Sequence, residues 1–204
     1  MARLGMVIDL KKCAGCYACV AACKVEHATP PGVFWCRAVK LESGVYPQVR
    51  RIPLPLQCMH CANPPCERVC PSGATRQRAD GVVTIDYGVC IGCRACMAAC
   101  PYEARYFLAE LKGYYDGQGL APCEELGYSS NGYVRGTVTK CNFCVERIDV
   151  GREPACVANC PGKARYVGDL DDPESEIARL IGNRGGFQLH PELGTDPSIY
   201  YLPA

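Results

Sequence analysis

The chain has 204 residues, a length that suits one domain or two small ones, and 18 of them are cysteine. This many cysteines indicates a disulfide framework, zinc sites or iron–sulfur clusters. A formal charge of +1 argues against nucleic-acid binding, which usually needs a basic face. The segment Met1–Ile8 is too short and too interrupted for a signal peptide, and no apolar run approaches the roughly 18 residues of a membrane span. We therefore expect a chain with no membrane insertion and no export signal of its own.

Short β-prone runs alternate with cysteine-rich loops along the sequence. We expect strands at 6–9, 82–86 and 166–169, with each cysteine loop leading into a short helix. The stretch 108–139 is rich in glycine and tyrosine and is predicted to be an inserted loop. The tail 171–204 is predicted to contain a short helix and a final extended segment. Because an ordered tail of this length has little core of its own, we expect it to contact another subunit.

Sixteen of the cysteines fall into four groups. Groups one and three have the spacing C-x2-C-x2-C-x3-C, group two has C-x2-C-x4-C-x3-C, and group four has a longer middle gap. A proline follows the last cysteine of groups two, three and four, whereas Lys24 has that place in group one. The four groups are Cys13, Cys16, Cys19 and Cys23; Cys58, Cys61, Cys66 and Cys70; Cys90, Cys93, Cys96 and Cys100; and Cys141, Cys144, Cys156 and Cys160.

These spacings favour iron–sulfur clusters over the two alternatives. Three cysteines on a tight loop can reach three corners of one cubane, and the fourth, three residues later, ligates a second cluster, as in two-cluster bacterial ferredoxins. A tetrahedral zinc site has no use for the third closely spaced cysteine. A disulfide framework needs an oxidising compartment and does not explain the repeated Cys-Pro ends. Four clusters would contribute roughly −8 and bring the loaded protein to about −7.

The groups belong to an internal repeat. Ile8-Asp9 precedes group one as Ile85-Asp86 precedes group three, and the run from Cys100 to Tyr106 matches the run from Cys160 to Tyr166. The repeated order of strand, cluster loop and short helix predicts an α+β ferredoxin-like unit that is used twice.

With these motifs the chain resembles the four-cluster iron–sulfur subunits of the dimethyl sulfoxide reductase family of molybdopterin oxidoreductases. The resemblance covers about residues 4–170 and is strongest in the segment Cys58–Cys66 and in Cys141-Asn142-Phe143-Cys144. It is closest to the small subunits of polysulfide, thiosulfate and arsenate reductases and of catechol dehydroxylases. Nitrate reductase relatives have a tryptophan in place of one group-three cysteine, whereas this chain has Cys93. The resemblance therefore implies four [4Fe-4S] clusters.

The resemblance also implies how the cysteine groups pair, with group one sharing its clusters with group four and group two with group three. We number the four implied ligand sets as sites. Site one is Cys13, Cys16, Cys19 and Cys160; site two is Cys141, Cys144, Cys156 and Cys23; site three is Cys90, Cys93, Cys96 and Cys70; site four is Cys58, Cys61, Cys66 and Cys100. The family arrangement implies that site one faces the pterin subunit and that site four faces the other redox partner.

The expected fold is α+β, with two ferredoxin-like units, each holding two [4Fe-4S] clusters, related by a pseudo-twofold repeat. The first half is residues 1–56 with 140–170, and the second half is 57–107. The insertion is 108–139, and the C-terminal tail is 171–204.

The resemblance implies an electron-transfer subunit without catalytic activity of its own. It would relay electrons between a catalytic subunit with a molybdenum or tungsten bis-pterin cofactor and a redox partner, such as a quinol-linked membrane subunit. Two alternatives remain: an electron-input subunit of a hydrogenase or a tungsten aldehyde oxidoreductase, and a free polyferredoxin. The compartment also stays open, because the subunit could be cytoplasmic or exported with a catalytic subunit that carries a twin-arginine signal.

Several chemically active residues remain outside the four groups. Neither Cys36 nor Cys123 has a second cysteine within four residues, so we expect neither to be a ligand, although an exported chain could join them in a disulfide. We expect His27, His60 and His190 to be structural, with one alternative for His60, which lies within a cluster loop and could donate a hydrogen bond to a cluster sulfide and raise its potential. Four cations near the cysteines either offset cluster charge or form solvated surface. They are Lys12, Arg94, Lys140 and Lys163.

Overall fold

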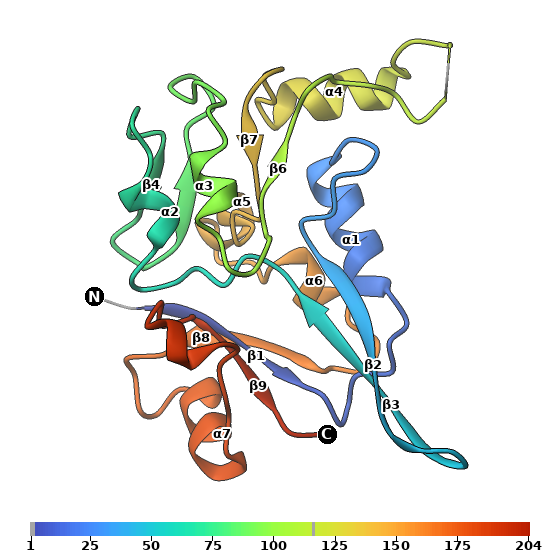
Figure 1. Cartoon of the computed structure of the whole chain (residues 1–204), viewed down its shortest axis with the longest axis vertical. Helices are drawn as coiled ribbons and strands as arrows, with labels where there is room; N and C mark the ends of the chain where they lie inside the picture. Colours follow the sequence, from blue (N-terminus) through green and yellow to red (C-terminus); the bar gives the residue numbers. More distant parts are fainter. Residues whose placement is uncertain (1–2, 116) are drawn as a thin grey trace.

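The computed structural model describes residues 3–115 and 117–204, so residues 1 and 2 of the predicted first half and residue 116 of the predicted insertion lie outside it. The described chain is a mixed α/β structure of short helices and four small sheets (Figure 1). None of its helices is long and apolar enough to span a bilayer. The predicted strands at 6–9, 82–86 and 166–169 are confirmed as β1, β5 and β8, with bounds shifted by one or two residues.

The largest sheet has three strands in the order β8-β1-β9. Its strands are β1 (Leu4–Asp9), β8 (Arg165–Asp169) and β9 (Ile199–Leu202), with β8 antiparallel and β9 parallel to β1. Alternation along β1 gives the sheet two apolar faces. Val7 packs against Ile177 of helix α7 (Glu176–Arg184), while Met6 and Ile8 face the cysteine-rich side of the molecule.

Helix α7 has clear start and stop signals. The side chain of Ser175 accepts a hydrogen bond from the backbone N–H of Ala178 at 3.2 Å, which caps the N-terminus. Gly185 ends the helix in the left-handed conformation. The helix lies beneath the three-stranded sheet in Figure 1 and covers the face opposite the cysteine loops.

A long hairpin projects from the body of the molecule. It is formed by β2 (Arg37–Val45) and β3 (Gln48–Leu56), which pair antiparallel. The last pair before the turn is Val45 with Gln48. Its free end extends away from the other elements in Figure 1, and Tyr46 at its tip is 88 % exposed. The sequence did not predict this hairpin.

Two small ribbons and five helices accompany the cysteine loops. The strand pairs are β4 (Thr75–Gln77) with β5 (Val83–Ile85) and β6 (Tyr106–Phe107) with β7 (Val138–Thr139). The helices are α1 (Ala18–His27), α2 (Pro65–Arg68), α3 (Ala95–Ala98), α5 (Val145–Ile148) and α6 (Ala155–Ala158). Helix α1 packs against α6 and α2 packs against α3, which brings together groups one and four and groups two and three.

The stretch 108–139 is more ordered than the predicted loop. It contains helix α4 (Pro122–Ser130) and then strand β7. Leu108, Tyr128 and Tyr133 are buried in one apolar cluster with Trp35, and the Tyr133 hydroxyl donates to the carbonyl of His27 at 2.8 Å. The aromatic residues therefore attach this stretch to the end of helix α1.

The tail 171–204 is held by the chain's own sheet. It contains α7, the short 3-10 helix Pro191–Leu193 and β9, and both Tyr201 and Leu202 are fully buried. The expectation that the tail lacks a core of its own is therefore wrong, because β9 pairs with β1 over four residues. A partner-subunit contact is not needed to explain its order.

Candidate metal centres

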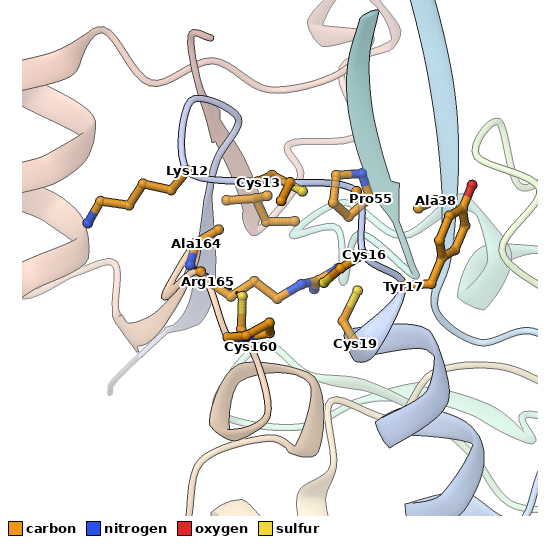
Figure 2. A pocket seen from close by; sticks show the side chains of 15 residues that line it. Lys12, Cys13, Cys16, Tyr17, Cys19, Ala38, Pro55, Cys160, Ala164 and Arg165 are labelled. Carbon is orange, nitrogen blue, oxygen red and sulfur yellow. Dashed lines mark hydrogen bonds between the residues drawn. The ribbon is translucent and has the colours of Figure 1, made fainter.

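Site one surrounds a cavity beside the base of the hairpin. Its lining includes all four predicted cysteines, Cys13, Cys16, Cys19 and Cys160. Figure 2 shows three of them on the loop and first turn of α1 and Cys160 entering from the opposite side, after α6. Gly15 is required in this loop, because its φ is +67° and an added Cβ would lie 3.0 Å from Pro53 of the hairpin.

Site three forms a second cavity of the same kind. Cys90, Cys93 and Cys96 line it together with Cys70, which comes from the preceding group. Its loop has nearly the backbone of the site-one loop. Gly92 has a φ of +68° and Arg94 a φ of +62°, against +67° for Gly15 and +60° for Tyr17.

Sites two and four lie deeper in the molecule. Burial raises the pKa of Cys23, and the neighbouring thiols of Cys156 and Cys144 raise it further. Burial likewise raises the pKa of Cys141, with Cys23 and Cys144 adding to the effect. The four predicted thiols of site two are therefore close enough to repel one another when ionised.

Site four shows the same mutual influence. Burial raises the pKa of Cys61 to about 12, and the thiols of Cys58, Cys66 and Cys100 contribute. Cys58, Cys61 and Cys66 are all buried. Each of the four predicted ligand sets thus brings three cysteines of one group together with the last cysteine of another.

The expected position of site four at the outer end of the series is wrong. Cys58 and Cys61 of site four are buried in one cluster against which Cys141 and Cys156 of site two pack, so site four lies beside site two. Cys66 of site four and Cys96 of site three share one buried cluster. Cys16 and Cys93 are the exposed members of sites one and three. The spatial order is therefore one, two, four, three.

Two histidines contact the cysteine sites. The Nδ1 atom of His60 accepts the backbone N–H of Val83 at 3.1 Å, while its Nε2 atom is buried without a hydrogen-bond partner among the described residues. The Nε2 atom of His27 lies 3.1 Å from the sulfur of Cys144 in site two. Sequence reasoning raised a cluster contact only for His60 and expected His27 to be structural.

The four cations singled out from the sequence behave differently. Only Lys140 is buried, at 2 % exposure. The Lys12 ammonium donates to the Tyr166 hydroxyl and its side chain points away from the site-one cavity in Figure 2, while Arg94 stacks on the ring of Phe107. Lys163 is exposed. Sequence reasoning missed the buried cations Arg105 and Arg165, although the repeated Ala-Arg-Tyr element that contains them was visible.

The two remaining cysteines lie in different surroundings. Cys36 is buried next to Cys19, and its sulfur accepts a hydrogen bond from Arg165 at 3.4 Å. Cys123 is exposed on α4. Both are free thiols, so the structure does not contain a disulfide between them.

The chemistry of these residues fits iron–sulfur clusters. The donors at every site are thiols, the ligand type that such clusters require. In addition, Nη2 of Arg105 and Nε2 of His60 are buried donors without a partner in the described part of the chain, and both lie near predicted ligands. Donors oriented toward cluster or ligand sulfur are the usual second layer of such sites.

Known proteins of similar sequence agree with this chemistry. The family described as "4Fe-4S dicluster domain" matches residues 49–130 and 125–170. The chain is 43% identical to the B subunit of selenate reductase from Mesobacillus selenatarsenatis, over 97% of this chain and 70% of that protein. It is 42% identical to a putative dimethyl sulfoxide reductase iron-sulfur subunit of Halobacterium salinarum, over 99% of this chain and 79% of that protein.

A third relative matches almost from end to end. The arsenate respiratory reductase iron-sulfur subunit of Shewanella sp. (strain ANA-3) is 38% identical over 98% of this chain and 96% of its own length. The chain therefore belongs to the 4Fe-4S iron–sulfur electron-transfer subunits of the dimethyl sulfoxide reductase family of molybdopterin oxidoreductases.

Proposed function

We propose that this chain holds four [4Fe-4S] clusters and relays electrons between a molybdenum or tungsten bis-pterin catalytic subunit and a second redox partner. The observation that carries the proposal is the convergence of four thiols, three from one group and one from another, at each predicted site. When bound, the clusters supply one-electron carriers. The chain itself contributes ligands, charge and separation from water, and we propose no catalytic step on it.

The ligand sets follow the sequence assignment. We propose that site one is held by Cys13, Cys16, Cys19 and Cys160, site two by Cys141, Cys144, Cys156 and Cys23, site three by Cys90, Cys93, Cys96 and Cys70, and site four by Cys58, Cys61, Cys66 and Cys100. Support comes from the matching φ values at Gly15 and Gly92, since equal loop backbones present equal sulfur positions.

We propose that the four sites form two ferredoxin-like halves related by a pseudo-twofold repeat. Residues 1–56 with 140–170 would hold sites one and two, and residues 57–107 would hold sites three and four. The packing of α1 on α6 and of α2 on α3 supports this division, because each helix pair joins the two groups of one half. The stretch 108–139 and the tail 171–204 are separate segments in this division, joined to the halves by the pairing of β7 with β6 and of β9 with β1.

The spatial order gives each end of the series a role. We propose that site one faces the catalytic subunit and that site three, in place of site four, faces the other partner, such as a quinol-linked membrane subunit. The exposure of Cys16 and Cys93 supports this choice of ends. The selenate and arsenate reductase names of the relatives favour a catalytic reductase subunit as the partner at site one.

Iron analysis tests the proposal directly. Anaerobically purified protein should contain about sixteen iron atoms per chain, four per cluster, and should show only [4Fe-4S] signals in reduced-state EPR. Cys36→Ser and Cys123→Ser serve as matched controls and should keep the full iron content, because neither residue belongs to a site. About twelve iron atoms, a three-iron signal in unoxidised protein, or loss of a cluster in either control would contradict the assignment.

A further inference from the structure

Three buried cations have no carboxylate partner within residues 3–115 and 117–204. Arg105, Lys140 and Arg165 are 5 %, 2 % and 4 % exposed, and none of them takes part in an ion pair with an aspartate or glutamate there. A buried charge is strongly unfavourable unless an opposite charge and hydrogen bonds compensate it. The compensating charge must therefore come from another source.

Arg165 lies between site one and site two. Its side chain lines the cavity of site one and extends from β8 toward the loop of Cys16 and Cys19 in Figure 2. Its Nη1 atom donates to Gln57 Oε1 at 3.3 Å and lies 3.7 Å from the sulfur of Cys156 in site two. Its other contacts are to the thioether sulfur of Met6 and, through Nη2, to the thiol of Cys36. The pKa of Cys19 in site one is lowered by a hydrogen bond with Cys36 and by the charge of Arg165, so the guanidinium is close to ligands of both sites.

Arg105 has the equivalent position in the other half. It follows Cys100 by five residues, as Arg165 follows Cys160. Its Nη1 atom donates to Thr75 Oγ1 at 3.2 Å, whereas Nη2 is buried with no partner in the described chain. The backbone N–H of the same Thr75 donates to the sulfur of Cys70 in site three at 3.4 Å. Burial raises the pKa values of Cys66 in site four and Cys96 in site three, and the charge of Arg105 opposes both increases. The guanidinium therefore lies between sites three and four.

Lys140 occupies the remaining junction, between site two and site four. Its ammonium donates to the carbonyl of Cys141 at 2.8 Å and also to the carbonyl of Val83. Val83 packs in the same buried cluster as Cys66 of site four. The charge of Lys140 opposes the effect of burial on the pKa of Cys141 in site two and, after the larger effect of His60, lowers the pKa of Cys58 in site four. Along the order one, two, four, three, each junction thus contains one buried cation.

We propose that Arg165, Lys140 and Arg105 are shared counter-charges, each of which raises the reduction potentials of the two clusters beside it. The inference rests on the proposed function, because it needs clusters at the four sites. One-electron reduction adds one negative charge to a site, and a nearby cation in a poorly solvated interior stabilises the reduced state. A cation between two sites acts on both, so its removal should lower two potentials and leave the distant pair unchanged.

The test is a redox titration monitored by EPR on Arg105→Gln, Arg165→Gln and Lys140→Met, with iron analysis of each variant. We expect each variant to lower two of the four reduction potentials. The equilibrium constant for reduction should fall at least tenfold at both sites, which corresponds to about 59 mV for one electron. The couples affected by Arg105→Gln and by Arg165→Gln should be complementary pairs. Lys140→Met should lower one reduction potential from each pair, those of sites two and four. The two sites that respond to Lys140→Met are then the inner ones, which gives the order of the sites.

Two further variants separate charge from packing. Arg3 pairs with Asp196 and hydrogen-bonds Ser198, so Arg3→Gln removes the same charge elsewhere and should leave all four couples unchanged. Arg105→Lys and Arg165→Lys keep a cation and should retain potentials within tenfold of wild type. If a Gln variant loses iron, the Lys variant at the same position distinguishes charge from packing. Full iron content and near-wild-type reduction potentials in the Lys variant support the role of charge. Loss of iron in the Lys variant as well assigns the residue to packing and overturns the proposal.

Two other results would also overturn it. Unchanged potentials in a variant with full iron would show that the cation does not act on the clusters. An equal shift of all four couples would show that it is not shared by two neighbours. By contrast, a wild-type protein without [4Fe-4S] signals would refute the proposed function itself.

Discussion

At the scale of single residues, His60 presents a neutral donor to site four. Burial lowers the pKa of His60, so the ring is neutral despite the opposing influence of the Cys58 charge. Because Nδ1 accepts the N–H of Val83, the ring proton lies on Nε2, the atom without a partner among the described residues. A hydrogen bond from this atom to sulfur would stabilise the more negative, reduced state of site four.

His60→Leu should therefore lower one of the four reduction potentials. We expect up to a tenfold change in the equilibrium constant for reduction, about 59 mV, with the other three couples unchanged. Redox titration followed by EPR measures the shift, and iron analysis confirms that the cluster is retained. His190→Leu is the control, since His190 is exposed and contacts Glu192. Four unchanged couples in a His60→Leu protein with full iron would exclude the hydrogen bond.

The sequence predicted the cysteine residues better than the residues around them. Cysteine spacing is local, so the four groups were visible without a structure, although the pairing of Cys23 with group four came from family resemblance. The burial of Arg105 and Arg165 depends on elements far away in the chain, so an arginine there is indistinguishable from a surface residue. The repeated Ala-Arg-Tyr element was the only local signal of their role.

At the scale of elements, the hairpin was missed because of its prolines. Pro53 and Pro55 lie within β3, and proline normally argues against a strand. The register places Pro53 opposite Lys40 and Pro55 opposite Ala38. Because the two prolines are two residues apart, the backbone positions where each lacks an N–H both face the outer edge of the two-stranded ribbon. The ladder to β2 therefore tolerates them, a fact that depends on register and cannot be read from composition.

The exposed tip of this hairpin is a suitable docking element for the catalytic subunit. Val45 and Tyr46 are 82 % and 88 % exposed, and Ala38 and Pro55 at the hairpin base line the site-one cavity. Exposed apolar groups of this kind mark interaction surfaces. The double variant Val45→Ser, Tyr46→Ser should bind the catalytic subunit about tenfold or more weakly than wild type, as expected for loss of aromatic anchors.

Co-purification and titration of the two subunits would measure this effect, and the iron content should stay at the wild-type value. Leu126 on α4 is 71 % exposed and lies in the stretch 108–139, so Leu126→Ser is a matched control that should bind normally. If the control weakens binding and the hairpin variant does not, the catalytic subunit docks on the α4 side.

At the scale of the whole molecule, the cysteines are part of the core. Of the four apolar clusters formed by described residues, three contain buried cysteines. The exception is the small cluster of Val7, Ile177 and Leu202 between α7 and the three-stranded sheet. With only four phenylalanines and one tryptophan in the sequence, an apolar core without the cysteines would be thin. The contribution of the tail to the sheet depends on the pairing of β9 with β1, which composition does not show.

This organisation implies that the iron-free chain cannot fold as a unit. Without clusters, the buried Arg105, Lys140 and Arg165 lose their counter-charge, and an uncompensated buried charge costs roughly 3–5 kcal/mol. Three such costs are comparable to the roughly 5–15 kcal/mol by which whole domains are stable. The absence of the clusters would also leave unfilled space beside the site cysteines in three of the four apolar clusters, which adds to the loss.

We expect anaerobically chelated protein to show no cooperative thermal transition by circular dichroism, whereas the loaded protein melts in a single step. In hydrogen exchange, any residual protection should be confined to β1, β8, β9 and α7, because their shared apolar cluster contains no cysteine. Refilling the chain with iron and sulfide should restore the transition, which separates missing clusters from chemical damage. A cooperative transition in the iron-free chain, or protection at α2 and α3, would show that the apolar core holds the cysteine sites in place without the clusters.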